Sequence, residues 1–146
     1  QKLYQSKDFS EIDFSEYLKQ LTEHLLHVFK TRQGDITIEI EAANVNLSID
    51  LAIPCGLILN ELISNSLKYA FPPGKKGMIT IKFKYHNNGY EIIVIDNGIG
   101  FPEDINYKET KSLGLQLVNT LVGQIEGTIT MKVSSGTTFS IQFQKK

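Results

Sequence analysis

The hydrophobic and polar positions of this 146-residue chain follow two different periods, which predict its helices and strands. Apolar residues recur every three or four positions in segments that predict helices at about residues 14–28, 54–70 and 112–125. Short apolar runs, most of them alternating with polar residues, predict strands at residues 35–41, 47–49, 78–85, 90–95, 128–133 and 137–143. The chain is therefore expected to combine helices and strands.

The ends of these elements are predicted from capping and turn residues. Ser10 or Asp13 is expected to cap the first helix, because each is followed three positions later by an acidic residue. Asp50 is expected to cap the central helix, since Pro54 fits only a first helical turn. The pair Asn88–Gly89 predicts a hairpin turn.

The central helix, predicted over Pro54–Ala70, divides into two faces. The apolar face consists of Ile58, Leu59, Leu62, Ile63, Leu67 and Ala70. The other face consists of Asn60, Glu61, Ser64, Asn65 and Lys68, with Leu57 as the one apolar exception. A solvated polar face is the ordinary interpretation, but asparagine and serine weaken a helix interior, which favours a functional face. Glu61, Asn65 and Lys68 stand at i, i+4 and i+7, where they could together hold a hydrated divalent cation and a phosphate.

Composition limits the kind of protein this can be. Apolar residues make up 41% and charged residues 21% of the chain, as in an ordinary globular domain. A formal net charge of -1 argues against nucleic-acid binding and against electrostatic attachment to a membrane. The single cysteine, Cys55, allows no internal disulfide and favours a reducing compartment. We expect no signal peptide and no membrane-spanning segment, and the chain, which starts at Gln1, is expected to be part of a longer protein.

Two further segments carry candidate chemistry. The apolar strand at residues 90–95 ends in Asp96-Asn97-Gly98-Ile99-Gly100. An ionised carboxylate at the end of a buried strand needs a partner, and a ligand amine is one candidate. Ser112-Leu113-Gly114 begins the last helix, where unpaired N–H groups favour an anion. Taken alone, the first segment is also an ordinary turn and the second a helix start with an incidental glycine.

Four segments in this order resemble the boxes of the GHKL ATP-binding domain, which is shared by DNA gyrase, a heat-shock chaperone, sensor histidine kinases and MutL. Asn60–Ala70 resembles the N box. The segments that resemble the three glycine-containing boxes are Asp96–Gly100, Ser112–Leu115 and Gly136–Phe139. The resemblance is to the histidine kinases in particular and covers about Phe14 to Phe143.

The resemblance implies a fold and a division of the chain. The fold would be α+β, a two-layer α/β sandwich in which a mixed, mostly antiparallel sheet is covered on one face by about three helices. Residues 13–146 would form the ATP-binding catalytic domain, and residues 1–12 a lead-in from an upstream dimerisation domain. The stretches Pro54–Leu62 and Ser112–Val118 resemble the sub-family whose phosphoacceptor lies in a His-Arg motif.

At the adenine end, the resemblance implies roles for Asp96 and Thr137. Asp96 would accept a hydrogen bond from the exocyclic amine of adenine, and Thr137 would support the same edge of the base. A carboxylate at this position rejects guanine, whose O6 is also an acceptor.

At the phosphate end, the resemblance implies that Asn65 gives an oxygen to Mg²⁺. Lys68 would contact phosphate and Tyr69 would pack near the sugar or the phosphates. Glu61 would orient the attacking imidazole or accept its proton, so that Glu61 and Lys68 are the candidate catalytic residues. The backbone positions expected to approach the nucleotide are Gly98, Gly100, Ser112, Leu113, Gly114 and Leu115.

The chain departs from the histidine-kinase pattern in two ways. The segment between the first two glycine boxes is short and has no recognisable phenylalanine box, which implies a short ATP lid. The chain also has no recognisable phosphoacceptor histidine or dimerisation helix pair, and His24 and His27 are expected to be ordinary solvent-side residues.

The expected function is therefore that of the catalytic half of a sensor histidine kinase. It would bind ATP and Mg²⁺ and pass the γ-phosphoryl group to a histidine on a separate dimerisation domain, which would then phosphorylate a response regulator. The domain would be cytoplasmic, without direct membrane or nucleic-acid contact, and the full-length protein could be attached to a membrane. The alternatives are a GHKL serine kinase of the anti-sigma-factor type and a non-catalytic nucleotide-binding interaction module. A gyrase- or MutL-type ATPase is less favoured, because those domains usually extend into a transducer domain.

Overall fold

The computed structural model describes residues 11–29, 35–42, 45–72, 74–99 and 113–144. Five strands form one sheet: β2 (Ile36–Glu41), β4 (Gly77–His86), β5 (Gly89–Asp96), β6 (Thr128–Val133) and β7 (Thr137–Gln144). Their spatial order is β2-β4-β5-β7-β6. The pair β2–β4 is parallel and the other pairs are antiparallel. The sheet is mixed and mostly antiparallel, as predicted.

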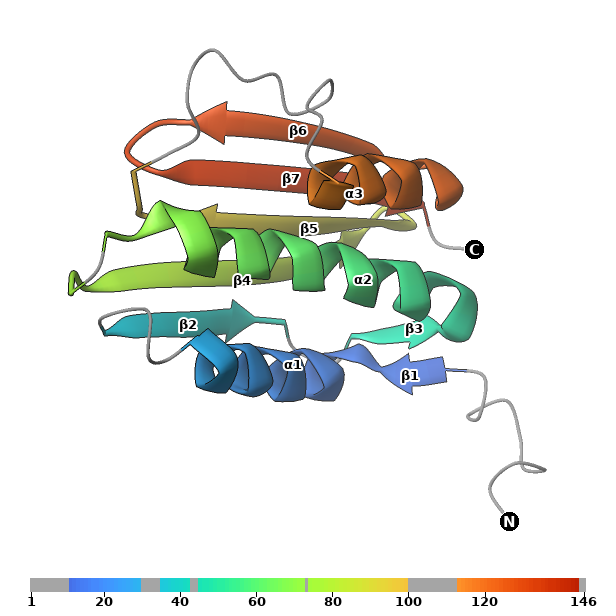
Figure 1. Cartoon of the computed structure of the whole chain (residues 1–146). Coiled ribbons are helices and arrows are strands. Elements are labelled where there is room, and N and C mark those ends of the chain that lie inside the picture. The colour runs from blue at the N-terminus through green and yellow to red at the C-terminus, as the bar shows by residue number, and fades with distance from the viewer. Residues whose placement is uncertain (1–10, 30–34, 43–44, 73, 100–112, 145–146) are drawn as a thin grey trace.

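Three helices cover one face of this sheet: α1 (Phe14–Phe29), α2 (Ile49–Asn65) and α3 (Leu113–Gln124) (Figure 1). The predicted two-layer α+β sandwich is confirmed. The core lies between the layers, where its largest fully buried side chains are Phe14, Leu18, Leu47, Ile58, Leu59, Leu62, Ile63, Leu67, Ile79, Ile81, Ile92 and Ile141. No helix within the described residues is both long enough and apolar enough to cross a lipid bilayer.

A second, two-stranded sheet was not predicted. It pairs β1 (Glu11–Asp13) with β3 (Asn46–Ser48) in antiparallel register, next to the start of α1 (Figure 1). Asp13 also caps α1, because its Oδ1 accepts a hydrogen bond from the Glu16 backbone N at 3.1 Å. The expected capping residue is thus confirmed as Asp13.

The start of the central helix differs from the prediction. Helix α2 begins at Ile49, so Asp50 is its second residue and not its cap, and Pro54 is its sixth residue. Proline inside a helix leaves the carbonyl four residues earlier without its usual N–H partner. Leu51 and Cys55 are buried in the core on either side of this position. Burial of this first part of the helix outweighs the local cost, which a capping argument does not consider.

The predicted hairpin between β4 and β5 is present, but its turn lies one residue earlier than expected. Asn87 and Asn88 form the turn with φ angles of 53° and 60°, and Gly89 already pairs with His86 across the strands. Two consecutive residues with positive φ match the right-handed twist of a two-residue hairpin.

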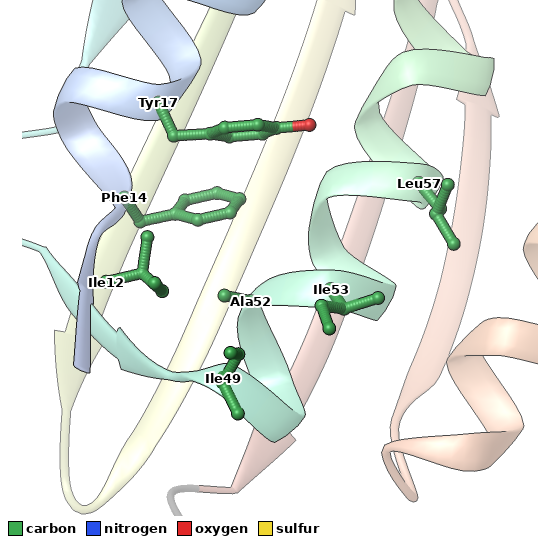
Figure 2. A pocket seen from close by; sticks show the side chains of 7 residues that line it. All are labelled: Ile12, Phe14, Tyr17, Ile49, Ala52, Ile53 and Leu57. Atoms are coloured by element: carbon green, nitrogen blue, oxygen red, sulfur yellow. The ribbon is translucent and has the colours of Figure 1, made fainter. Parts of the chain in front are cut away.

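Helices α1 and α2 meet where Gly56 lies beneath the ring of Tyr17. A β-carbon at position 56 would lie 2.8 Å from the Tyr17 hydroxyl oxygen, so the glycine allows this close contact. Beside this contact an open apolar pocket of about 330 Å³ is lined by Ile12, Phe14, Tyr17, Ile49, Ala52, Ile53 and Leu57 (Figure 2). Leu57, the apolar exception on the polar face of the helix, is 45% exposed at this pocket.

Candidate functional site

The centre of the candidate site is the carboxylate of Asp96, the last residue of β5. Only 6% of Asp96 is exposed. Its Oδ2 accepts a hydrogen bond from Ser66 Oγ at 2.9 Å. Its Oδ1 accepts hydrogen bonds from the backbone N of Gly98 at 3.0 Å and of Thr137 at 3.3 Å. A buried carboxylate requires hydrogen-bond partners, and here the protein itself supplies three of them.

Thr137 is the first residue of β7 and stands directly opposite Asp96 in the antiparallel register. It is buried, with 5% of its surface exposed. The preceding residue, Gly136, has a φ of +126°, and a β-carbon there would collide with the Asp96 carbonyl oxygen. The last glycine box thus brings the β6–β7 turn against the end of β5, and only glycine fits its first position.

The first glycine box packs against the end of the N-box helix. A β-carbon at Gly98 would collide with the carbonyl oxygen of Ala70, and the neighbouring Ile99 N donates to that same oxygen at 2.8 Å. The absence of a side chain at Gly98 therefore serves contact between two parts of the protein. Gly100 lies outside the described residues.

The sequence pattern predicted an α-helix that continues to Ala70, but the N-box helix does not stay α-helical that far. After Asn65 it continues as one π-helical segment, η3 (Ser66–Ala70). A π turn is wider than an α turn and is often found at functional sites. Lys68 and Tyr69 are exposed on this segment, and Tyr69 keeps 69% of its surface. The predicted i, i+4, i+7 column therefore holds for Glu61 and Asn65 but not for Lys68, which lies beyond the α-helical part.

Glu61 and Gly114 bring the N box together with the second glycine box. A β-carbon at Gly114 would lie 2.9 Å from Glu61 Oε1, so the carboxylate lies against the first turn of α3. The N-terminal turn of a helix favours a negative charge. Asn65 lies one turn further along α2 and, like Glu61, is half-buried.

The remaining predicted site residues are placed as follows. Leu115 is 4% exposed and its side chain belongs to the core. Leu113 is the first residue of α3, and Ser112 lies outside the described residues, together with the expected lid. His24 and His27 are exposed on α1, as predicted.

Ser66 is the residue that sequence reasoning missed. It was part of the N box but had no role assigned. It is 9% exposed, because helical spacing places it on the same side of the helix as the buried Leu62 and Ile63. A serine on the apolar face of the helix was the available signal, but its partner, Asp96, lies 30 residues further along the chain.

Comparison with known proteins gives a matching family and several relatives. Residues 50–146 match the family described as histidine kinase-, DNA gyrase B-, and HSP90-like ATPase. The sensor histidine kinase PdtaS of Mycobacterium tuberculosis is 32% identical over 88 residues, which cover 59% of this chain and 18% of that protein. Blue-light-activated histidine kinase 2 of Erythrobacter litoralis is 26% identical over 131 residues, covering 84% of this chain and 37% of the relative. The chain therefore spans only 18% to 37% of the length of these relatives.

A solved structure and a shorter relative complete the comparison. The histidine kinase domain of the Erythrobacter litoralis EL346 blue-light activated histidine kinase superposes with a TM-score of 0.84 at 24% identity, covering 92% of this chain and 62% of that one. The serine-protein kinase RsbW of Listeria innocua is 25% identical over 107 residues, covering 64% of this chain and 68% of RsbW.

Proposed function

The chain belongs to the family of histidine kinase-, DNA gyrase B-, and HSP90-like ATPases, and we propose that it is the Mg-ATP-binding catalytic domain of a two-component sensor histidine kinase. It transfers the γ-phosphoryl group of ATP to a histidine on a separate dimerisation domain, which then phosphorylates a response regulator. The observation that carries the proposal is the buried carboxylate of Asp96 at the end of β5, which accepts hydrogen bonds from Ser66 Oγ and from the backbone N of Gly98 and Thr137. The sensor histidine kinases among its relatives support the same class.

At the adenine end, Asp96 accepts a hydrogen bond from the exocyclic amine of the base. A carboxylate with three hydrogen bonds already in place keeps acceptor capacity, because its two oxygens offer about four lone-pair positions. Guanine would place a second acceptor against this charge, which selects ATP over GTP. Thr137, directly across the strands, supports the same edge of the base.

At the phosphate end, the half-buried Asn65 fits the role of an oxygen ligand to Mg²⁺. The metal, when bound, neutralises charge on the phosphate oxygens. Lys68 contacts phosphate and Tyr69 packs near the sugar or phosphates, both from the exposed side of η3. The backbone at Ser112, Leu113, Gly114 and Leu115 is proposed to contact the phosphates, and the backbone at Gly98 and Gly100 to contact the nucleotide.

Glu61 is the proposed proton acceptor or orienting group for the attacking imidazole. Its carboxylate lies against Gly114, at the helix start where the phosphates are expected. Phosphoryl transfer depends mainly on positioning and charge stabilisation, so holding Glu61, Asn65 and the phosphates together is the main contribution of this domain.

Three finer assignments belong to the same proposal. The phosphoacceptor lies in a His-Arg motif, the ATP lid between residues 100 and 112 is short, and the domain works in the cytoplasm. They rest on the resemblance of residues 54–62 and 112–118 to that sub-family and on the single cysteine.

Nucleotide titration of the chain tests the proposal. We expect Mg-dependent ATP binding, and we expect Asp96→Asn to weaken it by about 10- to 100-fold, since a hydrogen bond to a charged group is lost. Isothermal titration calorimetry measures both. Absence of Mg-dependent binding in the wild-type chain, or equal binding by the variant, would contradict the proposal.

The second candidate function is that of a serine kinase of the anti-sigma-factor type, which the similarity to RsbW favours. The two kinases differ in the chemistry of the phosphorylated product. Transfer of label from γ-labelled ATP to an added acceptor domain gives an acid-labile product on histidine and an acid-stable product on serine. We expect the acid-labile product, and no label on the chain itself, since His24 and His27 are assigned no role.

A further inference from the structure

Ser66 and Asp96 form a hydrogen bond between two buried side chains from different layers of the fold. Ser66 Oγ lies 2.9 Å from Asp96 Oδ2, and the two residues are 9% and 6% exposed. Ser66 is the first residue of η3 and Asp96 is the last residue of β5. Because an ionised carboxylate has no proton to give, the hydroxyl is the donor.

The two oxygens of Asp96 are used differently. Oδ1 accepts from two backbone N–H groups, those of Gly98 and Thr137, which matches its two lone pairs. Within the described residues Oδ2 accepts from Ser66 alone, which leaves its second lone pair for a ligand donor. Ser66 therefore bonds to the same oxygen that is left for the amine of the base.

The position of Ser66 is fixed from two sides. On one side, Ser66 follows directly on Asn65, the last residue of α2. On the other side, Ala70 at the end of η3 accepts a hydrogen bond from Ile99 N at 2.8 Å. The end of the N-box helix is thus joined to the segment around Asp96 at two points. These two contacts hold the segment that carries Ser66 next to Asp96.

We propose that Ser66 is a positioning residue for base selection, because its hydroxyl directs the free lone pair of Asp96 Oδ2 toward the exocyclic amine of adenine. The inference rests on the proposed ATP-binding function and adds to it a residue that determines how strongly the amine is recognised. Ser66 acts through Asp96 and on the amine alone, and the remainder of the purine and the triphosphate do not depend on it.

The test compares two nucleotides that differ only in this amine. Mg-ATP and the triphosphate of purine riboside, which lacks the 6-amino group, are titrated against the wild-type chain and Ser66→Ala by calorimetry. We expect Ser66→Ala to weaken ATP about tenfold, as for loss of support at a charge-assisted hydrogen bond. Binding of the amine-free analogue should change by less than about twofold.

Ser140→Ala is the matched control. Ser140 Oγ also donates to a carboxylate oxygen, Glu91 Oε2 at 3.0 Å, but on the sheet surface away from Asp96. It should change the affinity for neither nucleotide. Thermal unfolding of both variants shows whether they are folded at the titration temperature, and Ser66→Thr, which keeps the hydroxyl, should restore part of the preference for ATP.

Each outcome decides one claim. Equal weakening of ATP and of the analogue by Ser66→Ala would show a merely structural role and overturn the inference, as would unchanged ATP affinity. If the wild-type chain bound no ATP at all, the proposed function itself would fail. ATP binding by the wild-type chain, together with a loss in Ser66→Ala that affects ATP but not the amine-free analogue, supports both the proposed function and the role of Ser66.

Discussion

The two ends of helix α2 are held in place by different kinds of contact. In its N-terminal part, Cys55 and Ile58 are fully buried among apolar side chains, and Gly56 lies against the ring of Tyr17. Beyond its C-terminal end, in η3, Ser66 donates to a buried carboxylate and Ala70 accepts from the loop after β5. Apolar contacts fill space without directing any atom, whereas the polar contacts fix the direction of single atoms. The first part is therefore expected to determine stability and the second to determine nucleotide binding.

The largest expected effect lies in the apolar part. Ile58→Ala removes a side chain that is 0% exposed and should lower the free energy of unfolding by about 2–5 kcal/mol, because it leaves a cavity between the layers. Urea unfolding measures the loss, and the ATP affinity of the remaining folded protein should stay within about twofold of wild type. Leu57→Ala, at a neighbouring position that is 45% exposed, should cost less than about 1 kcal/mol. Equal costs at both positions would remove the distinction between core and surface in this helix.

The next effect should combine both properties. Gly136→Ala places a β-carbon against the Asp96 carbonyl oxygen at a φ of +126°, and should cost about 1–3 kcal/mol and abolish measurable ATP binding. Thermal unfolding measures the loss of stability, and calorimetry measures the loss of ATP binding. Gly123→Ala is the control, since a β-carbon there meets no atom within 4 Å, and it should be neutral or stabilising. A Gly136→Ala variant with full ATP affinity would argue against the proposed place of Asp96 in the site.

A smaller effect, confined to function, is expected from Gly114→Ala. A β-carbon there would lie 2.9 Å from Glu61 Oε1, the end of a flexible side chain that can move aside, so stability should change by less than about 0.5 kcal/mol. Displacing Glu61 should slow phosphoryl transfer about tenfold in the kinase that contains this domain. Rapid-quench measurement of the transfer rate at saturating Mg-ATP tests this. An unchanged rate would show that the position of Glu61 is unimportant for the reaction.

The smallest effect concerns alkaline pH and the apolar part. Burial raises the pKa of the Cys55 thiol to about 12 from 9.0, and burial also raises the pKa of Tyr90. The Cys55 thiol stays neutral in the folded chain but ionises in the unfolded chain above about pH 9, so the stability it contributes is complete below about pH 9 and is lost as the pH rises toward about 12. Between pH 8 and pH 10, Cys55 alone should account for a loss of about 1.4 kcal/mol in urea unfolding.

Cys55→Ala provides the control for this pH dependence. The variant should lose less stability over the same pH interval than the wild-type chain, whatever its stability at pH 8. Identical pH slopes would mean that the thiol is not protected from ionisation by the fold. The native wild-type thiol should likewise resist alkylation at pH 8, where about one in 10,000 molecules carries the thiolate.

The order of helices and strands could be predicted from the sequence because long periodic segments carry their own signal. Three features could not. The strand β1 is three residues long, too short to show a period, and depends on pairing with residues 46–48. The early start of α2 at Ile49 depends on burial against the core. The π turn from Ser66 to Ala70 changes backbone hydrogen bonds without changing the pattern of apolar residues.

The candidate site was predictable in its residue types and less so in its contacts. Asp96 and Thr137 were identified through their boxes, and the strand register places them opposite each other. Gly98 was expected to give room to a ligand, whereas in the structure it gives room to the Ala70 carbonyl. The bond from Ser66 joins residues 30 positions apart, and no local pattern encodes it.

The contact between Gly56 and Tyr17 links two positions that are 39 residues apart in the chain. Any larger residue at position 56 would push the aromatic ring, and with it α1, away from α2. Among homologous sequences these two positions should therefore vary together, with a bulkier residue at 56 accompanied by a smaller one at 17. Such paired substitutions would record the spacing of the two helices independently of the nucleotide site.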